Sequence, residues 1–306
     1  METETSTTTI PGAAGPRLVE FDSHGTVVRG VLRVPEAATP VPLVVLAHGL
    51  GGLKEWTIPE LSVMLGDAGI ATLAFDYRTF GDSDGTPREE VDHVGQIEDW
   101  RSAITFATAV PEVDSSRIAL WGTSLGGRNA LAACALDHRV AVVVAQVPPI
   151  TGSEQLAAMI VNGGNVEAFR AALAQDARLR LAGGEPRYVD IPNDPATDYG
   201  SYWATFGEAE KRNWTPHLTL QSFAPSLADD ILPLMPRIAP RPMLLLLTSD
   251  DALCSTDQQL VAYQSVDGPK SLQVYPGHHY SLYTTWKAEA LGAAVEWFAR
   301  HLLTDE

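Results

Sequence analysis

The chain has 306 residues, of which 45% are hydrophobic, and its formal net charge is −17 at pH 7. This length predicts either about two domains or one α/β domain with an insertion. The acidic charge argues against nucleic acid and anionic membrane surfaces as partners, because both would repel the protein. No apolar run approaches the roughly 20 residues of a membrane span, so no membrane partner is expected.

The composition of the N-terminus and the small number of cysteines bear on where in the cell the protein is located. Residues 1–6 are acidic and polar, without the apolar stretch of a secretory signal, so we expect residues 1–16 to form a flexible tail. Cys134 and Cys254 are expected to be buried thiols, which favours a cytoplasmic location. There is no C-x-x-C or H-x-x-x-H spacing, and we predict neither a metal nor a cofactor. The expected partner is a small-molecule substrate, and a homo-oligomer is left open.

The predicted elements alternate between strands and helices. Residues 17–34 alternate around a turn signal at 23–25, which predicts an antiparallel hairpin. Helical spacing of apolar residues occurs at 97–107 and 291–302. Continuous apolar runs are typical of parallel strands covered on both faces; they lie at 43–47, 71–75, 118–121, 141–145 and 243–247, with 272–275 as the last strand. The predicted fold class is therefore α/β, with a mostly parallel sheet flanked by helices.

Residues 147–236 interrupt this rhythm. They carry helical stretches at 155–161 and 166–181 and many aromatic residues, but no parallel-strand signal. The interval is too long for a connection, so we predict an inserted cap, with 1–146 and 237–306 as the core. Trp203 and Trp214, the largest apolar side chains of this cap, are candidates for substrate binding. The alternative is that the aromatic residues only pack the cap onto the core.

A G-x-S-x-G motif, Gly122-Thr123-Ser124-Leu125-Gly126, follows the apolar run 118–121 and precedes a predicted helix. A serine between a strand and a helix sits on a sharp turn that lifts its hydroxyl out of the sheet. The flanking glycines are needed because a side chain there would collide with the neighbouring elements. Ser124 is therefore the candidate nucleophile, and the alternative is a glycine-rich turn with an incidental serine.

A serine nucleophile needs a base, and the base needs an acid to hold its tautomer. Asp250 and Asp251 follow the apolar run 243–247, and His278 and His279 follow the last predicted strand. The chain order serine, aspartate, histidine is that of a catalytic triad at the ends of parallel strands. Spacing alone leaves both aspartates and both histidines open.

The third requirement is an oxyanion hole, because the tetrahedral intermediate carries negative charge on the former carbonyl oxygen. The backbone N–H of Leu125 is one candidate donor. The other is the N–H of Leu50 in His48-Gly49-Leu50-Gly51-Gly52, where the glycines let the backbone approach a substrate. A phosphate-binding loop is disfavoured because no G-K-[ST] follows.

Taken together, these motifs resemble the serine α/β-hydrolase superfamily, in particular its dienelactone-hydrolase-like and prolyl-peptidase-like capped esterases. The resemblance covers nearly all of the chain except the N-terminal tail and the cap. It implies the α/β-hydrolase fold with an inserted helical cap. The residues that carry it are His48 to Gly52, Phe75 to Gly85, Gly122 to Gly127, Asp251 and Pro276 to Tyr283.

The family pattern also selects between the open alternatives. It places the acid at the fourth residue of a G-x-x-D turn, which implies Asp251, and the base before an aromatic residue, which implies His279. Thr248 stands in the glycine position of the acid turn, and Thr79 replaces glycine in the D-x-R-G-x-G pattern. The first departure keeps Asp250 open as the acid.

We therefore predict a cofactor-independent serine hydrolase that cleaves a carboxylic ester, lactone or thioester through an acyl-enzyme. Ser124 attacks, His279 transfers the proton, Asp251 orients His279, and the N–H groups of Leu50 and Leu125 bind the oxyanion. The same triad also supports amide or peptide cleavage, C–C bond hydrolysis and acyl transfer. An alternative of another class is a non-catalytic small-molecule receptor on a hydrolase scaffold.

Overall fold

The structure, a computed structural model, describes residues 15–191 and 198–303. Its main element is an eight-stranded sheet in the order β1-β2-β4-β3-β5-β6-β9-β10. The pairs from β4 to β10 are parallel, as predicted. The strands are β1 (Arg17–Ser23), β2 (Thr26–Arg33), β3 (Val41–Ala47), β4 (Ala71–Phe75), β5 (Val113–Thr123), β6 (Val140–Gln146), β9 (Met243–Thr248) and β10 (Lys270–Tyr275).

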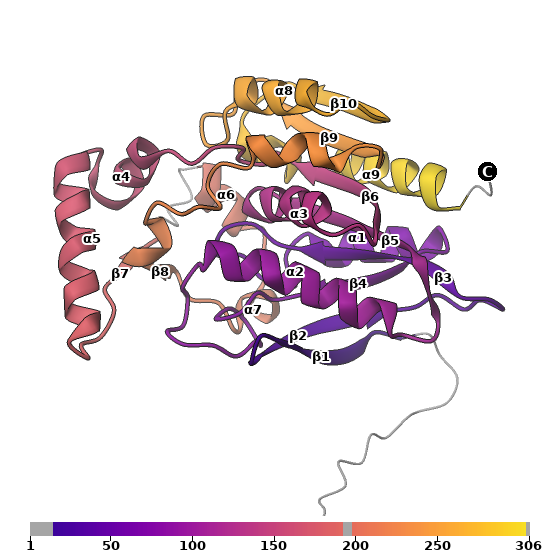
Figure 1. Cartoon of the computed structure of the whole chain (residues 1–306), viewed down its shortest axis with the longest axis horizontal. Helices are drawn as coiled ribbons and strands as arrows, with labels where there is room; N and C mark the ends of the chain where they lie inside the picture. Colours follow the sequence, from indigo (N-terminus) through magenta and orange to yellow (C-terminus); the bar gives the residue numbers. More distant parts are fainter. Residues whose placement is uncertain (1–14, 192–197, 304–306) are drawn as a thin grey trace, which may run out of the picture.

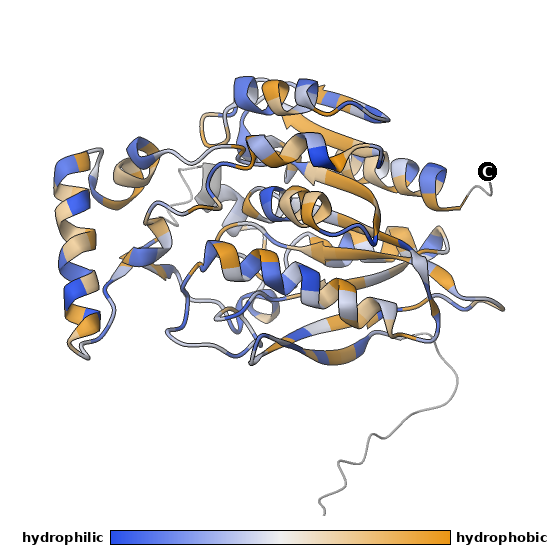
Figure 2. Ribbon diagram, in the orientation of Figure 1, coloured by the Kyte–Doolittle hydropathy of each residue, from blue (hydrophilic) through white to orange (hydrophobic). Residues whose placement is uncertain are grey.

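Several central strands are almost wholly apolar because helices cover both faces of the sheet. Every residue of β3, β4 and β9 is buried, and these strands form a hydrophobic layer through the molecule in Figure 2. The predicted hairpin is present at the sheet edge, where β1 pairs with β2 and β2 pairs with β4, both antiparallel. The sheet therefore has one solvated antiparallel edge and a buried parallel centre.

Helices of the core lie on the two faces of the sheet (Figure 1). One face carries α2, which packs against α3, and the other carries α1, which packs against α9. The core helices are α1 (Ile58–Asp67), α2 (His93–Thr108), α3 (Leu125–Leu136), α8 (Thr256–Ser265) and α9 (Lys287–Leu302). Apolar residues on their inner faces, such as Trp100 and Phe298, are fully buried against the strands. The predicted α/β architecture is confirmed.

Much of the segment between β6 and β9 extends beyond the carboxyl ends of the strands, at the left of Figure 1, whereas its last residues, 232–238, pack against α3 and α8. It has its own small apolar cluster around Ala158, Phe169 and Leu220. The predicted helices at 155–161 and 166–181 correspond to α4 and α5. The elements of the segment are α4 (Glu154–Asn162), α5 (Val166–Leu181), β7 (Tyr188–Asp190), α6 (Asp198–Trp203), α7 (Glu208–Lys211), β8 (His217–Thr219), and the 3-10 helices η1 (Leu220–Phe223) and η2 (Leu232–Ile238).

Three further sequence expectations concern the N-terminal tail, membrane spans and the cysteines. Residues 1–14 of the predicted tail lie outside the described residues. Within the described ranges, no helix combines the length and the apolar composition that crossing a membrane requires. Cys134 and Cys254 are both free and buried thiols.

Candidate active site

Ser124 occupies the sharp turn between β5, which ends at Thr123, and α3, which begins at Leu125. Its φ of 52° and ψ of −125° form a strained conformation that non-glycine residues rarely adopt. A Cβ atom on Gly122 would collide with the carbonyl of Gly126, so the turn needs glycine there. The N–H of Ser124 donates to the carbonyl of Gln146 on β6, at 2.8 Å. The sheet thus holds the strained turn in place and presents the serine at its carboxyl edge.

The loop after β3 lies directly beside this turn. A Cβ on Gly49 would be 3.1 Å from the Cβ of Ser124, and one on Gly126 would collide with the carbonyl of His48. Both glycines are therefore required by close backbone approach. Leu50 and Leu125, the two candidate oxyanion donors, line the same cavity as Ser124. The first N–H groups of a helix have no carbonyl partner within the helix, which leaves the N–H of Leu125 available to a ligand.

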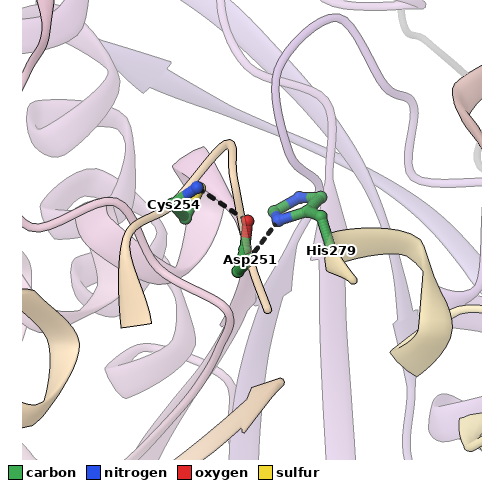
Figure 3. Close-up of side chains that lie close together, drawn as sticks. All are labelled: Asp251, Cys254 and His279. Carbon is green, nitrogen blue, oxygen red and sulfur yellow. Dashed lines mark hydrogen bonds and ion pairs between the residues drawn. The ribbon is translucent and has the colours of Figure 1, made fainter. Parts of the chain in front are cut away.

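Asp251 and His279 form a buried pair at the ends of β9 and β10 (Figure 3). The distance between His279 Nδ1 and Asp251 Oδ2 is 2.7 Å. The other carboxylate oxygen, Oδ1, accepts the backbone N–H groups of Leu253 at 2.9 Å and Cys254 at 2.7 Å. Because both oxygens are engaged, the carboxylate is fixed relative to the imidazole.

Asp250 and His278, the neighbouring candidates, make other contacts. Asp250 is exposed, and its carboxylate accepts the hydroxyl of Ser249 at 2.5 Å. The N–H of Asp250 donates to the carbonyl of Gly277 at 2.9 Å. His278 is the N-cap of η3 (His279–Leu282). The structure therefore pairs Asp251 with His279 and places Asp250 and His278 in turn-forming positions.

The environment of His279 favours its protonated form. Burial by itself lowers the pKa of this imidazole, but the interactions with Cys254 and Asp251 outweigh it and raise the pKa to about 10. Cys254 is thus a neighbour of the histidine that sequence reasoning missed, because it lies three residues beyond the aspartate in a loop without a recognised pattern.

A second pair joins the serine turn to the histidine loop. The hydroxyls of Thr123 and Tyr283 lie 2.5 Å apart, and both residues are buried. The Nε2 amide of Gln146 donates to the same threonine oxygen at 3.2 Å. These contacts connect β5, β6 and the segment after His279. No sequence motif indicates them, because the partners are 160 residues apart.

Lys54 anchors the far end of the loop after β3. Its ammonium lies 2.6 Å from Asp76 Oδ2, 2.7 Å from Asp82 and 2.8 Å from Glu55. Its backbone N–H also donates to Asp76 Oδ1 at 2.8 Å. Burial alone lowers the pKa of Lys54, but the attraction of Asp76 and the hydrogen bonds outweigh it and raise the pKa above its ordinary value. The lysine charge thus occupies the centre of this carboxylate cluster.

The two departures from the family pattern have local explanations. Thr79, in the glycine position, adopts a positive φ of 70°. Its N–H donates to the carbonyl of Asp84 at 2.7 Å and its hydroxyl to that of Glu90 at 2.7 Å, so hydrogen bonds hold the strained backbone. Thr248 ends β9 and is buried, and its carbonyl accepts the hydroxyl of Thr256 at 2.8 Å.

Trp203 and Trp214, the predicted substrate-binding residues, belong to an aromatic cluster with Trp56. Their ring centroids lie 3.8 Å apart with the planes tilted by 35°, and both rings pack against Trp56, with centroids 5.3 and 5.5 Å away. Neither is among the described residues that line the cavity at Ser124. Trp56, their shared partner, is itself a lining residue of the cavity. In the structure these two residues pack the segment between β6 and β9 against Trp56, and their role in substrate binding stays a prediction.

The cavity at Ser124 has a volume of about 1200 Å³. Its wall on the cap side is largely apolar, and its residues there include Leu156, Met159, Ile160, Ile191, Leu218 and Phe223. His48, Ser124, Cys254 and His279 lie on the core side. The cavity therefore combines a reactive polar end with an extended apolar wall.

One buried cation also lines this cavity. Arg128, on α3, lies 3.2 Å from Asp229 Oδ1 and 2.6 Å from His93 Nδ1. The Nε2 of His93 lies 3.0 Å from the carbonyl of Ser222. Because arginine can only donate, His93 accepts at Nδ1 and donates from Nε2, which makes it neutral. This arrangement links the core helix to the segment before β9.

Residues 44–290 match the sequence model of the alpha/beta hydrolase family. Quorum-quenching protein AidA of Acinetobacter baumannii (strain MDR-ZJ06) is 40% identical over 144 residues, about half of either chain at 47%. Thiohydrolase aneE of Aspergillus aculeatus is 30% identical over 276 residues, 85% of this chain and 86% of that protein. Polyketide transferase grgF of Penicillium sp is 29% identical over 294 residues, 93% and 96% of the two chains. The crystal structure of alpha/beta hydrolase GrgF from Penicillium sp. sh18 matches with a TM-score of 0.78 and 28% identity, covering 95% of this chain and 100% of its own.

Proposed function

This chain belongs to the α/β hydrolase family, and we propose that it is a serine hydrolase that cleaves an ester, lactone or thioester through an acyl-enzyme. The observation that carries the proposal is the strained turn of Ser124 beside the buried Asp251–His279 pair, with Ser124 and His279 on one cavity. A strained turn at a nucleophile is maintained by the surrounding fold and exposes the hydroxyl to substrate.

The chemistry follows from the pairing. With Nδ1–H donating to Asp251, a neutral His279 keeps its lone pair on Nε2 and takes the proton of Ser124 as the hydroxyl attacks the carbonyl carbon. The oxyanion accepts the N–H groups of Leu50 and Leu125, and the protonated histidine then gives its proton to the leaving alcohol or thiol. Water, deprotonated by the same nitrogen, cleaves the acyl-enzyme and regenerates the serine.

The size and the apolar wall of the cavity suit a substrate with a bulky, largely apolar acyl group. Its volume of about 1200 Å³ exceeds the roughly 300–1,000 Å³ of common small-molecule pockets. We assign this wall to residues 147–236 acting as a cap, and we expect it to choose the substrate while the core performs the reaction. A thioester is one of the bonds that we propose, since a thiohydrolase aligns along most of the chain.

Acyl transfer is the second candidate, favoured by the alignment with a polyketide transferase over 93% of this chain. The two reactions share the acyl-enzyme and differ in the group that accepts the acyl chain, water in one case and an alcohol or thiol in the other. A cytoplasmic location and the oligomeric state stay predictions.

The test measures turnover of p-nitrophenyl esters of increasing chain length and of matching acyl thioesters, with the wild type and Ser124→Ala. We expect turnover that Ser124→Ala abolishes, covalent labelling of Ser124 by a fluorophosphonate probe, and no labelling of the variant. Added alcohol acceptors distinguish transfer from hydrolysis by the product formed. Tight binding of these compounds with neither turnover nor labelling would instead identify a receptor.

A further inference from the structure

Three side chains of different chemistry meet beside the candidate nucleophile. One carboxylate oxygen of Asp251, the sulfur of Cys254 and one ring nitrogen of His279 all lie within 4.8 Å of one another (Figure 3). All three residues are buried, and Cys254 is a free thiol. Because Cys254 and His279 also line the cavity, a small ion can reach them from it.

This donor set matches a particular class of ion. Thiolate, imidazole and carboxylate are the groups that bind Zn²⁺ in proteins, and three protein ligands leave a fourth position for water. Bond lengths of 2.0–2.3 Å in a tetrahedron set the ligand atoms about 3.3–3.8 Å apart. The ligand atoms are up to 4.8 Å apart, and His279 Nδ1 lies 2.7 Å from Asp251 Oδ2, so binding needs adjustments of about 1 Å and replaces this hydrogen bond where Nδ1 coordinates. The hydrogen bond from the N–H of Cys254 to Asp251 keeps two ligands in register.

We propose that Asp251, Cys254 and His279 form a binding site for a thiophilic divalent cation, Zn²⁺ foremost, whose occupancy stops hydrolysis. On binding, the thiol of Cys254 and the protonated imidazole of His279 each release a proton to solvent; the sulfur then bonds to the ion, and the freed ring nitrogen donates its lone pair. Coordination at Nε2 removes the base directly. Coordination at Nδ1 displaces the proton shared with Asp251 onto Nε2, which then accepts nothing from Ser124.

Whether the ion binds does not depend on the proposed function. The predicted loss of activity does rest on the proposed function, because it assumes that the site hydrolyses esters. The first experiment therefore uses Ser124→Ala, which keeps all three ligands, titrated with Zn²⁺ and with Co²⁺ as a spectroscopic probe. We expect one equivalent to bind, with a sulfur-to-cobalt charge-transfer band. Cys254→Ser in the same background should weaken binding by at least about 100-fold, more than the loss of a supporting contact would.

Cys134→Ser is the matched control, since Cys134 is also a buried free thiol but does not line this cavity among the described residues. It should bind the ion as the wild type does. As a measurement that needs no variant, Zn²⁺ should protect Cys254 of the wild type from alkylation by iodoacetamide. Unchanged affinity in Cys254→Ser, absence of the band, or alkylation at an equal rate with and without Zn²⁺ would overturn the site.

The second experiment measures ester hydrolysis in the presence of Zn²⁺, with each variant compared with its own uninhibited rate. Inhibition should be reversed by a chelator and should require about 100-fold more Zn²⁺ in Cys254→Ser than in Cys134→Ser. If Zn²⁺ binds without slowing ester hydrolysis, the proposal that an occupied site stops hydrolysis is refuted. Absence of all ester turnover would refute the proposed function instead, while the titration of Ser124→Ala would still decide the metal site.

Discussion

The indole Nε1 of Trp214 donates a hydrogen bond to the backbone carbonyl of Gly51, at 2.8 Å. The two residues are 163 positions apart, and the bond joins the segment between β6 and β9 to the loop that carries Leu50. Trp203 packs against Trp214, but its own indole N–H makes no hydrogen bond to a backbone carbonyl within the described part of the chain. The pair therefore separates the effect of the hydrogen bond from that of aromatic packing.

Trp214→Phe keeps an aromatic ring and removes this hydrogen bond. A neutral hydrogen bond contributes about 1 kcal/mol, so we expect kcat to fall about fivefold because the loop of Leu50 is less well positioned. The KM should change little. Steady-state kinetics with a short ester measures both constants, and Trp203→Phe is the control. Equal losses in the two variants would show that only packing matters.

Lys54→Met should destabilise the fold strongly. The change leaves the buried Asp76 without its ion-pair partner, and breaking a buried pair from one side costs about 3–5 kcal/mol. Lys287→Met is the control, because Lys287 pairs with Glu60 at 2.6 Å while both side chains are substantially exposed. A surface pair contributes about 1 kcal/mol or less. Urea denaturation gives both free energies of unfolding, and similar values for the two variants would contradict the prediction.

Substitution of His279 should affect activity far more than substitution of the adjacent His278. His279→Ala removes the proposed base and should lower kcat by about 10⁴-fold or more, since the triad acts as a unit. His278→Ala removes an N-cap and should lower stability by about 1 kcal/mol with a small effect on kcat. Kinetics and thermal melts of both variants test this. A reversal of the two outcomes would move the base to His278.

The pH dependence of activity should be unusually alkaline. The base must be neutral, and the pKa of His279 is raised to about 10, so kcat/KM should rise with pH toward that value. Cys254→Ser removes one of the groups that favour the imidazolium and should move the rise to lower pH. Profiles of kcat/KM for the wild type, Cys254→Ser and Cys134→Ser provide the measurement. A rise centred at the ordinary histidine value of 6.5 would contradict the effect of Cys254.

Stability should fall in acid because of His48. Burial lowers the pKa of His48 to about 4, against the weaker opposing effect of its hydrogen bond to Gly49. Below pH 6.5 the unfolded chain binds a proton that the folded chain does not, so the contribution of His48 is complete above 6.5 and is lost as pH falls through about 4. Urea denaturation across this window measures the loss. His48→Gln should flatten it, and an unchanged slope would assign the loss to other groups.

Much of the fold could be predicted because buried parallel strands are continuous apolar runs. The run 118–121 identified β5, but the strand begins earlier, at Val113. The sequence did not indicate this part because residues 114–117 are polar or charged and are exposed or only partly buried. The helix α1 was missed. Its inner residues Ile58, Leu61 and Leu65 are buried, but Pro59 and the short length obscure the periodicity. The pattern of burial, which defines these elements, depends on tertiary neighbours.

The candidate site was predictable where order along the chain carries the information. The motif around Ser124 and the positions of Asp251 and His279 after strands follow from sequence alone. Contacts between distant segments do not, as with Thr123 and Tyr283 or the sulfur of Cys254. The size of Trp203 and Trp214 marked them as candidates for substrate binding, but the sequence could not show that both contact Trp56.

The hydrogen bond from the N–H of Ser124 to Gln146 has a consequence for hydrogen–deuterium exchange. This amide joins two central strands, so it should exchange only when the whole sheet opens, although the serine side chain faces the cavity. The backbone N–H of Ser124, the proposed nucleophile, should then be among the slowest to exchange in the described part of the chain. Heat should therefore inactivate the protein at the temperature at which it unfolds, because the strained turn of Ser124 has no separate way to relax.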